Sequence, residues 1–268
     1  MANPRALILT GYGINCDRET QQAFQIAGAI ARRVHINDLI DRLDTMDRYQ
    51  ILAIPGGFSY GDDIASGKVL ANRMKTHLSD AIETFIAHGN LVIGICNGFQ
   101  VLAKYGLLGL PRQGERTQTV TLTYNDSGRY EDRWVHLVSS NDRCVFTRGI
   151  HRLYLPVAHG EGKFYADAST LATLESQGLV ALRYSYEDGM PACGTFPWNP
   201  NGSCNDIAGV CDPTGRVFGM MPHPERFLTI TNHPRWTALL DHQKRQGRSI
   251  PDEGEGLQIF RNAVLYFG

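Results

Sequence analysis

The residue with the clearest chemical potential is Cys96, which stands in the segment Gly94-Ile95-Cys96-Asn97-Gly98. The apolar run before it predicts a buried strand, and the pattern after it predicts a helix. A nucleophile with glycine two positions away on either side is typical of a strained strand-to-helix elbow. The glycines keep the turn uncrowded, and a helix N-terminus favours a thiolate over a thiol. We therefore expect Cys96 to be a nucleophile; the alternative is a buried structural cysteine.

A reactive thiolate needs a base and a group that orients the base, and two His-x-Glu pairs offer both. His223-Pro224-Glu225 follows a strand-like run, and the prolines at 222 and 224 stiffen its backbone. In His159-Gly160-Glu161, glycines at 160 and 162 predict a looser segment. The pattern favours His223 as the base and Glu225 as its orienting carboxylate, and leaves His159 and Glu161 as secondary candidates. For either pair, a solvated surface loop is the alternative.

A glycine turn, Pro55-Gly56-Gly57-Phe58-Ser59, follows another predicted strand. Bare backbone N–H groups beside a nucleophile can form an oxyanion hole, although a sharp turn alone would also use these glycines. The stretch from Gly61 to Lys68 does not match a phosphate-binding loop, because its spacing is one residue too long and Val69 occupies the Ser/Thr position. We therefore predict no ATP site in this chain.

Composition narrows the function classes. The 268 residues carry 26 basic and 27 acidic side chains, so no field of one sign favours nucleic acid or an anionic membrane. No apolar stretch approaches the roughly 18 residues of a membrane-spanning helix, and the start lacks the apolar segment of a signal peptide. A cytoplasmic location is expected. The six cysteines are scattered, which indicates reduced thiols, and the spacing of Cys193, Cys204 and Cys211 is poor for zinc. We predict no metal site.

The first hundred residues alternate between short apolar runs and helical patterns. We predict strands at 6–9, 31–36, 51–54 and 92–95 and helices at 17–29, 38–46 and 69–88, with Asp17 and Gly89 as helix caps. This alternation predicts an α/β fold with an open, mostly parallel sheet and helices on both faces. Ligands of such sheets lie beyond the carboxyl ends of the strands, so the tips after residues 9, 54 and 95 should converge on one crevice.

The second half predicts strands at 120–124, 133–138, 152–158, 180–185 and 217–221, and we expect the sheet to gain additional antiparallel strands. Polar, glycine-rich turns separate them, and no linker or repeat interrupts the chain. We therefore predict one domain over residues 1–268 with an extended C-terminal tail, 227–268. Within this tail, a polar stretch at 243–256 precedes a predicted helix at 257–266.

Residues 94–100 together with His223-Pro224-Glu225 resemble the class I (triad) glutamine amidotransferases, whose fold is flavodoxin-like. More narrowly, the chain resembles the glutaminase subunits of phosphoribosylformylglycinamidine synthases. The blocks that carry this narrower resemblance follow one another in order at 13–19, 55–62, 133–135, 158–164, 199–203 and 219–226. The elbow alone would indicate only the superfamily. The chain departs from the resemblance in its longer tail after Arg226.

The resemblance implies a mechanism and a set of partners. Cys96 would attack the side-chain amide of glutamine, the backbone N–H groups of Gly57 and Asn97 would hold the oxyanion, and Gln100 would contact the bound glutamine. His223, oriented by Glu225, would protonate departing ammonia and then activate water against a γ-glutamyl thioester.

The ammonia would pass to a synthase subunit that uses ATP and Mg²⁺ to convert formylglycinamide ribonucleotide into formylglycinamidine ribonucleotide, in de novo purine biosynthesis. A small third subunit would complete the complex. The resemblance implies no cofactor in this chain itself.

Two alternatives stay open from the residues alone. One is a self-contained Cys-His-Glu hydrolase that acts on peptides or γ-glutamyl compounds. The other is a noncatalytic subunit that keeps the fold for docking, although the intact cysteine, histidine and glutamate weigh against it.

Overall fold

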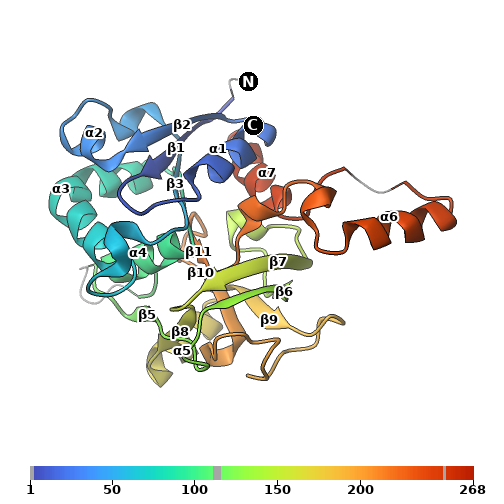
Figure 1. Ribbon diagram of the computed structural model, residues 1–268. Helices are drawn as coiled ribbons and strands as arrows, with labels where there is room; N and C mark the ends of the chain where they lie inside the picture. Colours follow the sequence, from blue (N-terminus) through green and yellow to red (C-terminus); the bar gives the residue numbers. More distant parts are fainter. Residues whose placement is uncertain (1–2, 111–115, 250–251) are drawn as a thin grey trace.

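The parallel half of one large sheet builds the edge on which the candidate site lies. The computed structural model describes residues 3–110, 116–249 and 252–268. Its strands are β1 (Arg5–Thr10), β2 (Ile30–His35), β3 (Ile51–Ile54), β4 (Leu91–Ile95), β5 (Val120–Thr123), β6 (Glu131–Ser139), β7 (Arg152–His159), β8 (Lys163–Ala166), β9 (Val180–Ser185), β10 (Ile207–Cys211) and β11 (Val217–Met220). Nine of them form a sheet in the order β2-β1-β3-β4-β11-β10-β9-β6-β7, and β5 pairs with β8 separately (Figure 1).

The direction of the strands changes in the middle of this sheet. β2, β1, β3, β4 and β11 run parallel, whereas β10, β9, β6 and β7 continue the sheet with antiparallel pairings. Every residue of β3, β4 and β11 is buried, as expected for parallel strands covered on both faces. The predicted fold class is therefore confirmed.

Helices cover both faces of the parallel half. The α-helices of the described residues are α1 (Asp17–Ile26), α2 (Ile36–Ile40), α3 (Lys68–Ala87), α4 (Asn97–Tyr105), α5 (Ala168–Ser176), α6 (Trp236–Arg245) and α7 (Leu257–Leu265). α3 packs against α4, and α1 packs against α7. α6 extends away from the body in Figure 1, and none of its residues is buried. Among the described helices, none has the length and apolar character needed to cross a membrane.

Several expectations about single elements were wrong. Asp17 is the first residue of α1 rather than its cap, because Cys16 occupies the cap position. The helix expected over 38–46 is limited to the short α2, because Arg42 turns into the left-handed region and the Asp44 carboxylate bonds to the Thr45 N–H and the Tyr49 hydroxyl. Prediction missed β8, β10, α5 and α6. The polar tail stretch at 243–256 includes residues 250–251, which lie outside the described residues.

The tail packs directly on the loop that follows β11. A Cβ atom at Gly256 would lie 2.0 Å from the Pro224 carbonyl oxygen, and one at Gly254 would lie 2.4 Å from that of Phe227. Further along, α7 meets α1 through an edge-to-face contact of Phe260 with Phe24 at 5.0 Å. The tail therefore supports two segments, residues 224–228 and α1, that both approach the candidate site.

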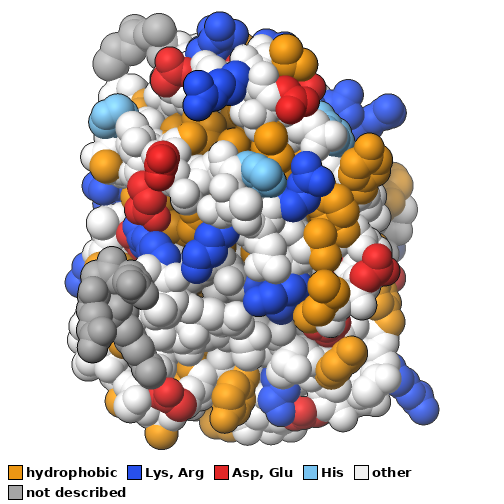
Figure 2. All heavy atoms as spheres, turned by 90° about the vertical axis from the view of Figure 1, so that its left-hand side faces the viewer, with side chains coloured by type: hydrophobic (Ala, Val, Ile, Leu, Met, Phe, Trp, Pro, Cys, Tyr) orange, Lys and Arg blue, Asp and Glu red, His pale blue; other side chains and the backbone are white. Residues whose placement is uncertain are grey.

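Charge is mixed over one face of the molecule. Figure 2 shows the face on the left of Figure 1, where Lys and Arg side chains lie among Asp and Glu. This distribution agrees with the formal net charge of −1 and gives no electrostatic reason to expect a nucleic-acid partner on that face.

The close approach at Gly256 generates a prediction. Gly256→Ala should lower the free energy of unfolding by about 1–3 kcal/mol, because the added methyl overlaps a backbone oxygen that cannot move freely. Urea unfolding would measure this loss. Gly11→Ala is the control, since its Cβ would meet only side-chain carbons at 3.5 and 3.8 Å. Equal stability of the two variants would contradict the packing described here.

Candidate active site

Cys96 lies at the bend between β4 and α4 and adopts a strained backbone conformation, with φ of 51° and ψ of −105°. A Cβ at Gly98 would lie 1.8 Å from the Ile54 carbonyl oxygen, and one at Gly94 would lie 2.5 Å from that of Gly98. The two glycines are therefore required by close backbone packing. A non-glycine residue at this φ costs about 1–3 kcal/mol and is often found at functional sites. The geometry is that of a nucleophile elbow.

The imidazole of His223 lies beside this elbow. Its backbone N–H bonds to Pro156 O at 2.8 Å, and its Nδ1 lies 2.6 Å from Glu225 Oε1. Residues Pro224–Arg226 form a single 3₁₀ turn, which brings the Glu225 carboxylate back to the ring. Burial disfavours a charged ring, yet the Glu225 carboxylate and the Cys96 sulfur outweigh burial and raise the pKa of His223 well above its usual value. The Glu225 carboxylate and the Cys96 sulfur therefore favour the protonated form of the ring.

Three polar groups near Cys96 have no hydrogen-bond partner among the described residues. His223 Nε2 is buried and has no regular hydrogen bond among the described residues. Among the residues that the structure describes, the backbone N–H groups of Gly57 and Asn97 also donate no hydrogen bond. Gly57 and Cys96 line a common cavity of ≈ 160 Å³. Asn97 directly follows Cys96 at the start of α4, so both N–H groups are placed to act as oxyanion donors.

Side chains of α4 connect the elbow to the neighbouring loops. Asn97 Oδ1 accepts from the Ser59 N–H at 3.1 Å, and its Nδ2 donates to Asp62 and Gln100. Gln100 in turn donates to the Glu161 carbonyl oxygen at 2.6 Å. Gln100 lines the cavity, and both of its polar side-chain atoms already have protein partners. It therefore joins the elbow to the loop after β7.

The second His-x-Glu pair does not make a His–carboxylate contact. His159 Nδ1 lies 3.1 Å from Asn125 Oδ1 and its Nε2 lies 3.5 Å from Asn201 Nδ2, so the ring bonds to two amides. Burial, and then the positive His223, lower its pKa to about 4. The expectation of a loose segment was wrong, because a Cβ at Gly162 would lie 2.3 Å from the His159 ring. His159 and the cavity-lining Glu161 thus form a packed wall of the site.

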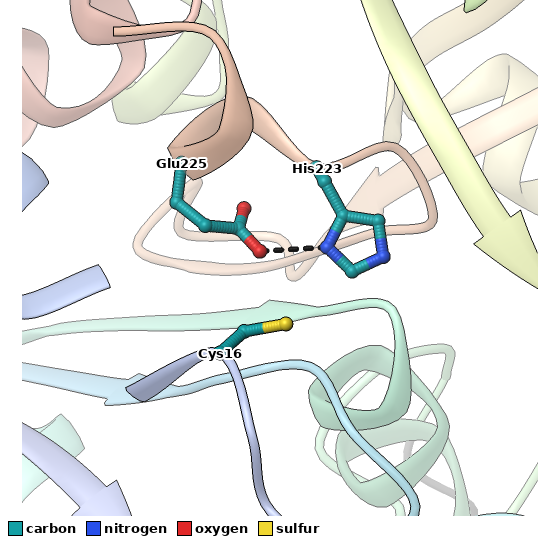
Figure 3. Close-up of side chains that lie close together, drawn as sticks. All are labelled: Cys16, His223 and Glu225. Carbon is teal, nitrogen blue, oxygen red and sulfur yellow. Dashed lines mark hydrogen bonds and ion pairs between the residues drawn. The ribbon is translucent and has the colours of Figure 1, made fainter. Parts of the chain in front are cut away.

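Cys16 and Arg226 lie next to the His223–Glu225 pair, which we call the dyad, and sequence reasoning assigned no role to either residue. Figure 3 shows Cys16 approaching His223 and Glu225 from the N-terminal segment, with its sulfur pointing toward them. The three side chains place donor atoms within 4.8 Å of one another, a set that suits a metal by type. However, His223 Nδ1 is committed to Glu225, and Arg226 Nη2 donates to the Cys16 sulfur at 3.2 Å. We therefore assign no metal ion to this cluster of three side chains. The only sequence signal was the pair of blocks at 13–19 and 219–226.

Comparison with known proteins defines the class. A sequence model of the CobB/CobQ-like glutamine amidotransferase domain matches residues 3–267, so the chain belongs to this family of glutamine amidotransferases. A solved glutamine amidotransferase from Thermotoga maritima is 14% identical to this chain, with a TM-score of 0.54. The superposition covers 100% of this chain and 98% of the other, which shows that the two share a fold.

The particular branch of this family follows from closer relatives. The phosphoribosylformylglycinamidine synthase subunit PurQ of Methanococcus maripaludis is 48% identical over 265 residues, which span 98% of this chain and 97% of the relative. The same subunit of Dehalococcoides mccartyi is 46% identical over 99% and 98% of the two chains. A chain of the PurLQS structure from T. maritima is 29% identical with a TM-score of 0.71, over 100% of both chains. The chain is a member of the PurQ family.

The environment of His159 predicts a pH dependence of stability. Unfolded, this histidine binds a proton near pH 6.5, whereas the folded protein resists protonation until about pH 4. The unfolded state therefore binds more protons in this window, and stability falls as the pH decreases through it. Between pH 7 and pH 5 the loss should be about 2 kcal/mol from this group. Urea unfolding of the wild type and of His159→Gln at both pH values would measure it, and an equal pH response of the two proteins would contradict the assignment.

Proposed function

We propose that this chain hydrolyses glutamine through a cysteinyl thioester and supplies the ammonia to a phosphoribosylformylglycinamidine synthase. The observation that carries the proposal is the strained Cys96 elbow beside a His223 ring whose Nδ1 is held by Glu225. Membership of the PurQ family supports the same substrate and reaction. The proposed catalytic residues are Cys96, His223 and Glu225.

The geometry suggests how the steps would proceed. The Cys96 thiolate attacks the side-chain carbonyl carbon of glutamine, and the developing oxyanion accepts from the N–H groups of Gly57 and Asn97. His223 then gives its proton to the departing nitrogen, which leaves as ammonia, and a γ-glutamyl thioester remains. The now neutral His223 takes a proton from water, which attacks the thioester and releases glutamate.

Partners and location follow from the family. Ammonia is mostly protonated in neutral water and then is no nucleophile, so it should pass to a synthase subunit without escaping to solvent. The T. maritima relative was solved as PurLQS, and we propose that the present chain also assembles with a synthase subunit and a small third subunit. ATP and Mg²⁺ would bind to the synthase, no cofactor would bind to this chain, and the complex would be cytoplasmic.

Cys96→Ala tests the proposed nucleophile. In the reconstituted complex it should abolish synthesis driven by glutamine, because no thioester can form, and should leave synthesis driven by ammonium salt within about twofold. Product formation with each nitrogen source would be measured side by side. Equal loss of both activities would mean that Cys96 is structural. Steady cleavage of peptides by the isolated wild-type chain would instead favour a self-contained hydrolase.

A comparison of the two histidines tests the proposed base. His223→Ala should lower glutamine-dependent synthesis by roughly 10²–10⁴-fold, the range expected for loss of a general acid–base group. His159→Gln, which can keep hydrogen bonds to the two amides, should cost less than about tenfold. Initial rates with saturating glutamine would separate them, and a larger loss in the His159 variant would reverse the assignment.

A further inference from the structure

The Cys16–Arg226 pair lies next to the proposed dyad and has no part in the mechanism described so far. Cys16 is 1% exposed, and its sulfur accepts from Arg226 Nη2 at 3.2 Å across 210 residues of sequence. Its backbone N–H bonds to the Gly56 carbonyl oxygen at 3.2 Å. Arg226 itself is largely exposed, so only the inner end of its guanidinium reaches the site.

This pair closes the side of the His223 ring that neither Glu225 nor Cys96 contacts. A Cβ at Gly56 would lie 2.8 Å from His223 Cε1 and 3.3 Å from the Cys16 sulfur, so backbone, sulfur and ring meet at one point. Glu225 holds Nδ1, and Cys96 lies near enough to influence the ring. The ring is thus enclosed by groups from three remote segments of the chain.

The charge states that the proposed reaction uses favour a further cation near the site. A thiolate, an imidazolium and a carboxylate together carry one negative charge in excess, and Cys96, His223 and Glu225 are each at most 5% exposed. Excess charge in a buried site is unfavourable unless it is compensated. Arg226 directly follows Glu225 in the chain and interacts electrostatically with Cys16, Glu225 and Cys96.

We propose that Cys16 and Arg226 are positioning residues for the glutaminase reaction: the sulfur anchors the guanidinium, which compensates the negative charge of the site and so favours an anionic Cys96. This inference rests on the proposed function only for its consequence on rate. The other titratable groups that influence this site are Tyr130, His159, Tyr184 and Glu225.

The first test uses the full chain and does not depend on turnover. Cys96 would be alkylated with iodoacetamide across a pH series and quantified by peptide mass spectrometry, which separates it from the accessible Cys193 and Cys204. Arg226→Met should move the midpoint of Cys96 reactivity upward by about half a pH unit, because a lost cation disfavours the thiolate. In 1 M salt the shift should shrink, because the Debye screening length falls to about 3 Å.

Matched variants separate charge from packing. Arg226→Lys keeps the charge and should keep the midpoint, and Arg245→Met, which removes an exposed arginine of α6 that pairs with Asp241, should change nothing. Cys16→Ala should shift the midpoint in the same direction as Arg226→Met by a smaller amount, and Cys16→Ser should restore it in part. If the Arg226→Met midpoint stays in place, or the shift is insensitive to salt, the proposal is wrong.

The second test measures glutaminase activity of the assembled complex. Below the midpoint, Arg226→Met should lower kcat/KM for glutamine about threefold, the factor that corresponds to half a pH unit, and should leave ammonium-fed synthesis unchanged. A uniform loss at all pH values would indicate a merely structural role and overturn the proposal. If Arg226→Met shifts the alkylation profile but the wild-type complex has no glutaminase activity, the charge effect stands and the proposed function is wrong.

Discussion

The site depends on how closely the first turn of α4 approaches β3. Gly98 packs so tightly on the Ile54 carbonyl oxygen that any side chain would overlap it, and the same turn forces Cys96 into a left-handed conformation. This contact fixes the position of the elbow relative to the strand tip that carries Gly57. The distance between the proposed nucleophile and the proposed oxyanion donor is thereby set by backbone atoms, which move less than side chains do.

Around this fixed point, the remaining parts come from distant segments that the parallel sheet brings to one edge. β1 and β3 lead into the loops that carry Cys16 and Gly57, which are joined by a bridge between Ile14 and Gly57. β11 lies next to β4 and leads to His223. The tail then packs on residues 224–228 and, through α7, on α1. The tail thus packs against the segments on both sides of the Cys16–Arg226 contact.

How far sequence reasoning reached depends on how local each feature is. The elbow and the His223-x-Glu225 spacing are short patterns, so the structure brings together residues that the sequence singled out. The Cys16–Arg226 contact spans 210 residues and leaves no local pattern. The same holds for the amides of Asn125 and Asn201 that enclose His159. Strand positions were predictable from apolar runs, whereas α6 has no buried face and therefore no periodic apolar pattern that points to a core.

Charge balance connects these parts to the proposed reaction. Before attack, the thiolate and Glu225 carry two negative charges, and the imidazolium and Arg226 carry two positive ones. Formation of the thioester removes the negative charge of the sulfur and, as His223 loses its proton to the departing nitrogen, also the positive charge of the ring. Glu225 and Arg226 remain and still balance each other. A buried triad whose net charge is balanced in both states by a guanidinium reaching it from the surface avoids a change in desolvation cost during the reaction. Without Arg226, both states would hold an excess negative charge, which would oppose formation of the thiolate from the start.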